Sequence, residues 1–381
     1  MKVTVSVGGR FWAFELAQQL LRRDYLNQLI TAYPASRAVK YGIPANKIKS
    51  LPLKEVIERG WRMAPSVVRR WWNPQFFVSE LFDRSAARRL VQSDIIVGWS
   101  NFSLHTFRRA KLLGARTVLE RANSHMLTQQ AILREEYDRW GVTGELAHPA
   151  IVTKELQEYE LTDYVSVPSS FVKRTFIERG FPAERIIQVP FGVNLSMFTQ
   201  LPKTDKVFRV VFVGTMSLRK GIPYLLRAFA ELKLPNAELC LVGRLLDEVK
   251  PFFDQYRGSY RWLGQQPQSE LNRFYSQGSV FVLMSVEEGL AMVLAQAMAC
   301  GLPVICTPNT GGEDIVRDGV DGFIIPLRDT EALKEKLTFL AEHPEVCARM
   351  GASARERVSR GFSWDDYGEQ MIQAYEKILR K

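Results

Sequence analysis

Two acidic residues, Glu287 and Glu288, stand between a predicted strand and a predicted helix in the second half of the chain. The apolar run Val280–Met284 before them is typical of a buried strand. Gly289 then leads into a segment rich in Ala, Leu and Met, which predicts a helix that ends at Gly301. Free amides at a helix N-terminus and the helix dipole both favour an anion at such a junction. The stretch therefore predicts an anion-binding site at the exit of a buried strand.

Two adjacent cations, Arg219 and Lys220, stand at a second junction of the same kind. A strand is predicted over Phe208–Gly214 before them and a helix over Gly221–Leu232 after them. Loops at the carboxyl ends of parallel strands bind ligands, where Arg offers a planar fork to phosphate oxygens and Lys a point charge. A solvated pair is the usual fate of adjacent cations and would be favoured for this pair alone. Together with the Glu288 segment, the pair predicts a site for a phosphate-bearing ligand.

The order of residues in both segments resembles the donor-binding signature of the retaining glycosyltransferases of family 4. Residues 288–305 read E-G-x-x-x-x-x-x-Q-A-M-A-x-G-x-P-V-I, and residues 214–221 read G-x-x-x-x-R-K-G. The likeness is strong over residues 165–381 and looser over residues 1–125. It implies an α/β fold of the GT-B type, in which two Rossmann-like, doubly wound parallel-sheet domains face a central cleft.

The resemblance implies roles for individual residues. Glu288 would contact hydroxyls of the donor sugar, and Arg219 with Lys220 would neutralise charge on the leaving nucleotide, so that neither a metal nor a cofactor is required. His125 follows the predicted strand Arg116–Glu120 and matches by position the family's active-site histidine. These four residues are the predicted catalytic set. The predicted donor-binding set comprises Gly8, Gly9, Gly214, Arg244, Gly289, Leu290, Ala291, Met292 and Gln296.

Some of these positions depart from the family pattern or have a plainer explanation. Gln296 stands where the family has a glutamate that holds the ribose hydroxyls, and an amide carries no charge, so we expect weaker or altered ribose binding. Ala291 stands where glycine is common, which narrows the access to the backbone slightly. A lone histidine after a strand is usually structural or solvated, although the placement of His125 favours a function. The spacing to Gln296 selects Glu288, and not Glu287, as the functional acid.

Alternating strands and helices predict two blocks of βα units, and hence parallel sheets covered on both faces. The blocks meet at the short polar segment 201–206. This predicts an acceptor-binding domain at 1–200, a nucleotide-sugar-binding domain at 201–361 and a final helix at 362–381, which the resemblance implies crosses back to the first domain. The predicted strands are Lys2–Val7, Asp94–Gly98, Arg116–Glu120, Tyr164–Val167, Arg185–Val189, Phe208–Gly214, Glu238–Val242, Val280–Met284, Pro303–Cys306 and Gly322–Ile325. The predicted helices include Phe14–Arg23, Ser66–Trp72, Phe76–Val91, Ser103–Leu113, Ser124–Trp140, Ile151–Leu161, Ser170–Arg179, Gly221–Leu232, Asp247–Tyr256, Ser269–Gln277, Leu290–Cys300, Thr330–His343 and Glu345–Ser359.

The net charge of +10 is carried by the first half of the chain. Residues 1–200 hold 28 Lys and Arg against 18 Asp and Glu, whereas residues 201–381 hold 23 of each. Within the first half, Trp61, Trp71 and Trp72 stand among arginines. The pattern predicts a polyanionic partner, and we expect an anionic membrane surface and no nucleic acid, since no reader motif is present. The alternative is that the aromatic residues pack inward and the arginines are solvated.

The bulk composition predicts a globular protein of the cytoplasm. With 46% hydrophobic and 24% charged residues, each half can bury a core. An apolar run of 18 residues is absent from the sequence, so no transmembrane helix is expected. The first residues alternate like a strand instead of forming a signal region, and the four cysteines form no C-x-x-C pair and predict reduced thiols. We therefore expect a cytoplasmic protein that can be peripheral on the inner face of the plasma membrane.

Together with the resemblance, the sequence predicts a retaining, metal-independent hexosyltransferase. It would move a sugar from a UDP- or GDP-sugar to a glycan, lipid-linked or small-molecule acceptor, in bacterial polysaccharide or glycolipid biosynthesis. Two alternatives stay open: a GT-B sugar-nucleotide epimerase, and a non-catalytic donor-binding partner subunit, for which Gln296 is the only hint. The intact Arg219, Lys220 and Glu288 argue against the partner subunit.

Overall fold

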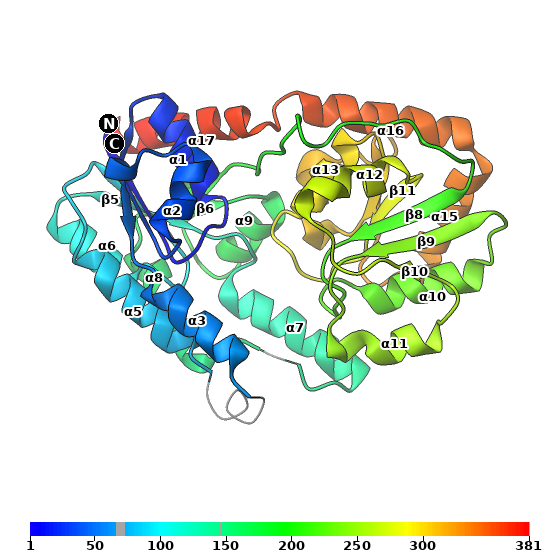
Figure 1. The fold of residues 1–381 in the computed structure, drawn as a ribbon, viewed down its shortest axis with the longest axis horizontal. Helices are drawn as coiled ribbons and strands as arrows, with labels where there is room; N and C mark the ends of the chain where they lie inside the picture. Colours follow the sequence, from blue (N-terminus) through cyan, green and yellow to red (C-terminus); the bar gives the residue numbers. More distant parts are fainter. Residues whose placement is uncertain (66–72, 145, 381) are drawn as a thin grey trace.

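The computed structural model of the protein describes residues 1–65, 73–144 and 146–380. In this part of the chain, two parallel β-sheets with helices on both faces lie side by side (Figure 1). The N-terminal sheet has seven strands in the order β3-β2-β1-β4-β5-β6-β7, and the C-terminal sheet has six in the order β10-β9-β8-β11-β12-β13. The predicted fold class, two doubly wound parallel sheets, is confirmed.

The two sheets use separate stretches of the chain. The N-terminal elements are β1 Val3–Val7, α1 Ala13–Arg22, β2 Leu26–Thr31, α2 Ala35–Ala38, β3 Ile48–Ser50, α3 Leu53–Met63, α5 Gln75–Ala87, β4 Ile95–Trp99, α6 Leu104–Leu112, β5 Arg116–Glu120, α7 Met126–Trp140, α8 Pro149–Leu161, β6 Tyr164–Val167, α9 Ser170–Ile177 and β7 Ile186–Gln188. The C-terminal elements are β8 Phe208–Val213, α10 Ile222–Leu232, β9 Ala237–Val242, α11 Lys250–Gln255, β10 Arg261–Trp262, α12 Leu271–Ser276, β11 Val280–Leu283, α13 Met292–Ala299, β12 Val304–Cys306, α14 Gly312–Ile315, β13 Gly322–Ile324, α15 Thr330–Glu342, α16 Pro344–Ser359 and α17 Trp364–Arg380. The predicted domain boundary at residues 200 and 201 falls between β7 and β8.

The apolar strands lie at the centre of each sheet. All five residues of β1 are buried, because β1 pairs in parallel with β2 on one side and β4 on the other. Val5 lies opposite Leu29 and Val97 in this register. Strands buried on both faces read as nearly continuous apolar runs, which is why β4, β8 and β11 could be predicted, whereas β1 was recognised by its alternation of valine with Thr4 and Ser6.

The structure corrects the prediction in the segment between α1 and α5, where β2, β3 and α3 were missed. The strand β2 carries Asn27 and Gln28 in its interior, and Gln28 is nevertheless buried. The strand β3 has only three residues, Ile48–Ser50, at the edge of the sheet. Both strands therefore lack the apolar run that identifies a central strand. The helix predicted over 66–72 lies outside the described residues.

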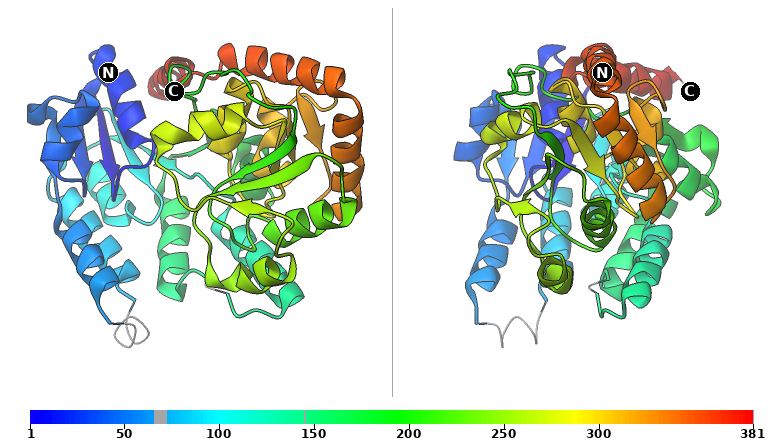
Figure 2. Two further views of the ribbon diagram at one scale, coloured as in Figure 1. Left: turned by 45° about the vertical axis from the view of Figure 1, so that its right-hand side comes forward. Right: turned by 90° about the vertical axis from the view of Figure 1, so that its right-hand side faces the viewer.

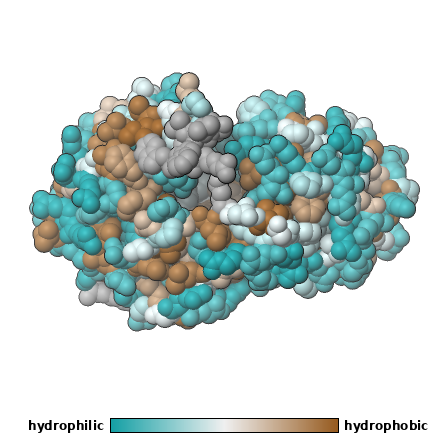
Figure 3. Space-filling view, turned by 90° about the horizontal axis from the view of Figure 1, so that it is seen from below, coloured by the Kyte–Doolittle hydropathy of each residue, from teal (hydrophilic) through white to brown (hydrophobic). Residues whose placement is uncertain are grey.

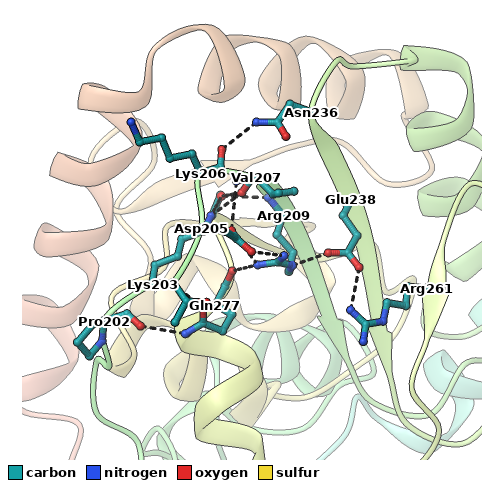
Figure 4. Close-up of polar contacts among 12 residues, drawn as sticks. Pro202, Lys203, Asp205, Lys206, Val207, Arg209, Asn236, Glu238, Arg261 and Gln277 are labelled. Atoms are coloured by element: carbon teal, nitrogen blue, oxygen red, sulfur yellow. Dashed lines mark hydrogen bonds and ion pairs between the residues drawn. The ribbon is translucent and has the colours of Figure 1, made fainter.

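The segment predicted as a linker is fixed on the C-terminal domain (Figure 4). Lys203 Nζ donates to the main-chain oxygen of Val207 and to Ser279 Oγ, both at 2.6 Å. At the start of β8, Arg209 forms ion pairs with Asp205 at 2.8 Å and Glu238 at 2.6 Å. The chain therefore enters the C-terminal sheet as a structured part of that domain.

The last helix, α17, crosses back to the N-terminal domain (Figures 1 and 2). Gln19 Nε2 on α1 donates to Asp365 at 2.7 Å, and Arg23 pairs with Glu369 at 3.1 Å. On the inner face of α17, Tyr367 and Tyr375 are among the large, fully buried side chains. The two domains are thus joined by the chain between β7 and β8 and again by α17.

Apolar side chains are exposed on α3 and at the start of α5, next to the residues drawn in grey in Figure 3. The exposed fraction is 62% for Val56, 87% for Met63 and 53% for Phe77. Arg59 and Arg62 of α3 are exposed beside them. Arg69, Arg70, Trp71 and Trp72, on which the membrane prediction also rests, lie outside the described residues. Among the helices that the structure does describe, a segment both long and apolar enough to cross a bilayer is not found.

Candidate active site

The two predicted segments meet at one edge of the C-terminal sheet. The loop after β8 brings Arg219 and Lys220, and the loop after the neighbouring strand β11 brings Glu287 and Glu288. Arg219 Nε lies 3.0 Å from Glu287 Oε2, and Arg219 Nη2 lies 3.6 Å from Glu288 Oε2. Lys220 Nζ pairs with Glu288 Oε1. Two cations and two carboxylates thus form one cluster at the carboxyl ends of adjacent parallel strands, as the sequence predicted for such loops.

The charges in this cluster stabilise one another. Burial alone would raise the pKa of Glu288, but the neighbouring Lys220 and Arg219 hold that pKa below its usual value. Burial would likewise lower the pKa of Arg219, and Glu288 and Glu287 raise it instead. The carboxylate of Glu288 and the guanidinium of Arg219 therefore stay charged at neutral pH.

Glu287, which the sequence analysis passed over, is the most completely buried member of the cluster. Its Oε1 accepts hydrogen bonds from Ser124 N at 3.1 Å and Ser124 Oγ at 2.7 Å. Its Oε2 accepts from Gln129 Nε2 at 3.1 Å, in addition to the contact with Arg219. Ser124 and Gln129 belong to the N-terminal domain, so this carboxylate joins the two domains across the cleft. The spacing of the motif carries no signal for this role, because the partners are more than 150 residues away.

Gly289 is the closest point of approach between the two domains in this region. A Cβ built on Gly289 would stand 1.3 Å from the main-chain oxygen of Ala122, which no side chain tolerates. On the other side, Ser169 Oγ donates to Gly289 O at 2.7 Å. Glycine is therefore required at position 289 because the N-terminal domain packs directly against it. This requirement is independent of any contact between Gly289 and a donor.

The predicted donor-contacting amides divide into two groups. Ala291 N donates to Thr310 O at 3.0 Å, so this amide is committed to packing inside the C-terminal domain. Met292 is the first residue of α13 and is partly exposed, as a helix N-terminus that can meet an anion should be. The predicted helix start at Leu290 is therefore corrected by two residues, and Leu290 itself is buried. Because the Ala291 amide is already bonded to Thr310, we do not expect this amide to contact the donor.

Gln296 lies about one turn along α13 and faces a cavity of about 680 Å³ between the domains. Tyr275 OH donates to Gln296 Oε1 at 3.1 Å, so the amide oxygen is already used. The –NH₂ group of Gln296 keeps its capacity to donate to a ligand. Met292 lines the same cavity from the C-terminal domain, opposite Phe11 and Trp12 of the N-terminal domain.

Gly214 and Arg244 line a second cavity, of about 390 Å³, at the carboxyl ends of β8 and β9. Arg244 O accepts from Met216 N at 2.8 Å, and Gly243 packs on the main-chain oxygen of Gly214 so closely that a Cβ would stand 1.9 Å away. Gln265 completes one wall. Thr215, in the loop that carries Arg219, also lines this cavity.

Gly8 and Gly9 follow β1 and lead to the wall of the larger cavity. Thr31 Oγ1 donates to Gly9 O at 2.7 Å, and a Cβ on Gly8 would collide with the ring of Phe102. Phe11, two residues on, has a φ of 43° and is half exposed in the cleft. The loop that follows Gly8 and Gly9 thus borders the cleft between the domains. Glycine at position 8 is also required by the close packing against Phe102.

His125 lies inside the N-terminal domain, where it caps α7. Its Nδ1 accepts from Leu127 N at 3.3 Å, and its ring packs against Tyr159 and Phe176 at centroid distances of 4.9 and 5.0 Å. Burial, with a contribution from the cations Arg121 and Arg179, lowers the pKa of His125 to about 4. Its described contacts explain it as a neutral helix cap, and its catalytic role stays a prediction from sequence position.

The strand exit that leads to His125 also carries Glu120, Arg121 and Asn123. Arg121 is buried, pairs with Glu155 at 2.7 Å, and donates to Ser124 O at 2.9 Å. Glu120 accepts from Trp12 Nε1 at 3.0 Å, and burial raises the pKa of Glu120 to about 7. Arg121 therefore stabilises the loop at Ser124 that contacts Glu287, whereas Glu120 is hydrogen-bonded to Trp12.

One group of potential metal ligands is found among the described residues, Glu80, Asp83 and His105 on the outer helices α5 and α6. Lys154 Nζ lies 2.7 Å from Glu80 Oε1 and 3.0 Å from Asp83 Oδ2. Asp83 also accepts from the first amides of α6, including Thr106 N at 2.9 Å. A lysine already neutralises this group, which is a helix cap remote from the Arg219 cluster. The predicted metal independence is not tested by this geometry.

Solved structures share this architecture over the whole chain. The Anabaena Alr3699/HepE protein in complex with UDP superposes with a TM-score of 0.71 at 17% identity, over 99% of this chain and 100% of that one. A sucrose-phosphate synthase from Thermosynechococcus elongatus gives a TM-score of 0.72 at 19% identity, over 100% of both chains. Two facing Rossmann-like sheets with a charged cluster at the cleft make this a GT-B protein.

Sequence comparison finds a family match in the C-terminal domain. Residues 195–357, less than half of the chain, match the family described as Glycosyl transferases group 1. An alpha-maltose-1-phosphate synthase of Mycolicibacterium smegmatis is 30% identical over 185 residues, which are 44% of this chain and 48% of the relative. A phosphatidyl-myo-inositol mannosyltransferase of the same organism is 28% identical over 201 residues, 50% of this chain and 52% of the relative. The chain thus spans about half the length of these curated relatives, and the predicted resemblance is confirmed for the C-terminal domain.

Proposed function

We propose that this chain is a retaining, metal-independent glycosyltransferase that moves a sugar from a nucleotide diphosphate sugar to an acceptor bound by the N-terminal domain. One observation carries the proposal. Arg219 and Lys220, in the loop after β8, form ion pairs with Glu288, in the loop between β11 and α13. Cations for a diphosphate and a carboxylate for sugar hydroxyls thus stand side by side in the cleft of a GT-B fold.

The ion pair between Lys220 and Glu288 marks the place of the donor. Without a ligand, each group neutralises the other, and both are mostly buried. A diphosphate brings negative charge that competes with Glu288 for Lys220. Glu288, once released, can accept hydrogen bonds from hydroxyls of the donor sugar. Binding of the donor would thus exchange one ion pair for two sets of ligand contacts and leave no charge unpaired.

The same cations would act in the chemical step. As the bond from the sugar's anomeric carbon to the diphosphate oxygen breaks, negative charge grows on the leaving group. Fixed cations aimed at that charge are the main electrostatic lever in such a transfer. The acceptor oxygen forms the new bond on the same face and passes its proton to the leaving phosphate oxygen, so that the anomeric configuration is retained. This step requires no nucleophile of the protein, and the cluster offers cations and not an activated nucleophile.

The donor and the pathway are proposed from the relatives. The HepE protein has been solved with UDP and with UDP-glucose. Other relatives include the mannosyltransferase above and a capsular polysaccharide biosynthesis glycosyltransferase of Staphylococcus aureus, 31% identical over 183 residues. We propose a UDP- or GDP-sugar donor, with its base in the cavity beside Gly214 and Arg244, and a role in polysaccharide or glycolipid synthesis. A glycan or lipid-linked acceptor would then enter from the side of Phe11 and Trp12.

A panel of nucleotide sugars tests this function directly. Purified protein is incubated with UDP-, GDP- and ADP-sugars, and release of the nucleoside diphosphate is followed by chromatography with and without EDTA. We expect slow hydrolysis of one donor class, unchanged by EDTA, with the α or β configuration of the donor kept in the product. Epimerised donor would indicate the epimerase instead, and binding without turnover the partner subunit. A strict Mg²⁺ requirement would refute metal independence.

A further inference from the structure

Of the two carboxylates in the described cluster with Arg219 and Lys220, that of Glu287 is the one bonded to both domains. It receives three hydrogen bonds from the N-terminal domain, from Ser124 N, Ser124 Oγ and Gln129 Nε2, at 2.7 to 3.1 Å. From the C-terminal domain it meets Arg219 Nε at 3.0 Å. A fully buried carboxylate is stable only with such a set of partners. Separation of the domains would remove three of the four and leave the anion with Arg219 alone.

The contact with Arg219 fixes the direction of its guanidinium group. Arg219 Nε donates a hydrogen bond to the main-chain oxygen of Glu287 at 2.9 Å and forms an ion pair with the Glu287 carboxylate, whose Oε2 lies 3.0 Å away. This anchors the inner edge of the guanidinium and leaves the outer Nη groups directed to the side of Glu288, where Nη2 lies 3.6 Å from Oε2. A guanidinium held by Nε presents its Nη pair as a fork to phosphate oxygens. Rotation of the Glu287 side chain would release that fork.

The N-terminal side of the contact is itself rigid. Arg121 is buried and donates to Ser124 O at 2.9 Å and to Gln129 Oε1 at 2.9 Å. It is anchored in turn by Glu155 at 2.7 Å. The two residues that bind Glu287 are thus held by a common arginine, and the neighbouring contact between Gly289 and the Ala122 carbonyl keeps the loops in register.

We propose that Glu287 is a positioning residue that couples closure of the two domains to alignment of Arg219 on the donor diphosphate. Only in the closed arrangement is its carboxylate fully hydrogen-bonded and held in the orientation in which its Oε2 lies 3.0 Å from Arg219 Nε. The role in alignment rests on the proposed function, whereas the link between the domains does not.

The chain offers a matched control for a buried carboxylate that crosses the domain interface. Glu136 on α7 accepts from Tyr224 OH at 2.8 Å and from Arg328 Nε at 2.7 Å, both in the C-terminal domain. It also accepts from Trp140 Nε1 at 2.8 Å, and it is fully buried. It shares the burial, the arginine partner and the interdomain position of Glu287, but it has no contact with the Arg219 cluster in the described structure.

The experiment compares Glu287→Gln with Glu136→Gln in the full chain. A glutamine at 287 still accepts from Ser124, but it turns an –NH₂ group toward the donors Gln129 Nε2 and Arg219 Nε. We expect a 10- to 100-fold loss of kcat for Glu287→Gln with KM changed less than threefold, and less than a threefold loss of kcat for Glu136→Gln. Ser124→Ala should lower kcat in the wild-type background and have a smaller effect in Glu287→Gln, since the two residues act through one contact.

Two readouts separate this inference from the proposed function. Small-angle scattering without nucleotide should show a larger radius of gyration for Glu287→Gln than for wild type, whether or not the protein is a transferase. If both Gln variants lose activity equally, or if Glu287→Gln keeps kcat within twofold of wild type, the coupling role is wrong. If wild type neither binds UDP, GDP or ADP nor acts on their sugars, the proposed function fails. If the scattering profile of Glu287→Gln is the same as that of wild type, the role of Glu287 in linking the domains is wrong, whatever the outcome for the proposed function.

Discussion

The two domains contribute to the cleft in opposite ways. The C-terminal domain brings four charged side chains on two short loops, Arg219, Lys220, Glu287 and Glu288. The N-terminal domain meets them with neutral groups, the hydroxyl and amide of Ser124 and the side-chain amide of Gln129 among them. The charges can act on a ligand, whereas the neutral groups can only hold the charges in place. Under the proposed function, the partly exposed charges of the C-terminal domain would act on the ligand and the N-terminal groups would help to position them, although the excess of positive charge lies in the first half of the sequence.

Removal of one charge from the C-terminal side should have the largest effect. Lys220→Ala takes away a cation aimed at the leaving diphosphate, and the loss of one aimed donor lowers kcat by about 10²- to 10³-fold. Glu288→Ala should abolish transfer in a folded protein. Steady-state kinetics on the active donor provides the measurement, with Lys206→Ala, an exposed lysine of the same domain, as the control. Turnover of Lys220→Ala within twofold of wild type would overturn the assignment of charge to this side.

A change that touches no charge tests the positioning side. Gly289→Ala places a Cβ 1.3 Å from the Ala122 oxygen, so the two domains cannot keep their contact. We expect a loss of kcat of about 10²-fold, the scale for misplacement of reacting groups by an ångström, while UDP still binds to the cations. Gly60→Ala on α3 has open space around it and serves as the control. Full activity of Gly289→Ala would show that closure at this point is dispensable.

The pH dependence of stability tests whether His125 has a structural role as the cap of α7 or a catalytic role. Its pKa of about 4 lies below the usual 6.5, so the neutral form stabilises the folded state above pH 6.5 and this stabilisation is lost as the pH falls toward 4. Between pH 7 and pH 5 this group alone should lower the free energy of unfolding by about 2 kcal/mol. His125→Asn, which keeps a cap for α7, should remove that part of the pH dependence in urea titrations. A catalytic role predicts instead that kcat falls by orders of magnitude while the pH dependence of stability stays.

Gln296 offers a test of where the C-terminal domain binds the ribose of the donor. Tyr275 occupies the amide oxygen, and a carboxylate at 296 would keep that bond and add an acceptor for a ribose hydroxyl. Gln296→Glu should therefore tighten UDP binding by about tenfold, since a hydrogen bond to a charged group contributes about 1.5–3 kcal/mol, with kcat nearly unchanged. Calorimetric titration with UDP measures this, and Tyr275→Phe controls for the internal bond. Identical affinities in all three proteins would place the ribose elsewhere.

The smallest effect concerns the outer surface of the N-terminal domain. Arg59 and Arg62 stand beside the exposed Val56 and Met63 on α3, and each cation near an anionic bilayer contributes roughly 1 kcal/mol. The double variant Arg59→Glu/Arg62→Glu should weaken co-sedimentation with phosphatidylserine vesicles at low salt. The same charge change in the C-terminal domain, Arg257→Glu/Arg261→Glu, should have little effect. Equal behaviour of both variants would remove α3 from the predicted membrane contact.

The elements that could be predicted from sequence share a physical property. A central strand such as β8 or β11 is buried on both faces, so its residues form an apolar run whatever the rest of the chain does. The strand β2 lies next to the edge strand β3 and carries Gln28, whose burial depends on the neighbouring helices and strands. In the missed helix α3, the apolar residues Leu53, Val56, Ile57 and Trp61 recur at helical spacing, but Val56 and Leu53 are exposed instead of packed in the core. The prediction therefore succeeded where the local sequence is sufficient for burial.

The two adjacent glutamates show how far the sequence determines the site. Spacing alone selected Glu288, and the loops that carry it and the cations Arg219 and Lys220 followed from strand, turn and helix signals within about 20 residues. The role of Glu287 was set only by tertiary structure, because its partner Ser124 is 163 residues away in the sequence. The same holds for the requirement for glycine at 289 and for the ring of His125, whose neighbours come from other helices. Short-range signals fix which groups leave a strand together, whereas the packing of one domain on another decides which of them faces a ligand and which is buried between the domains.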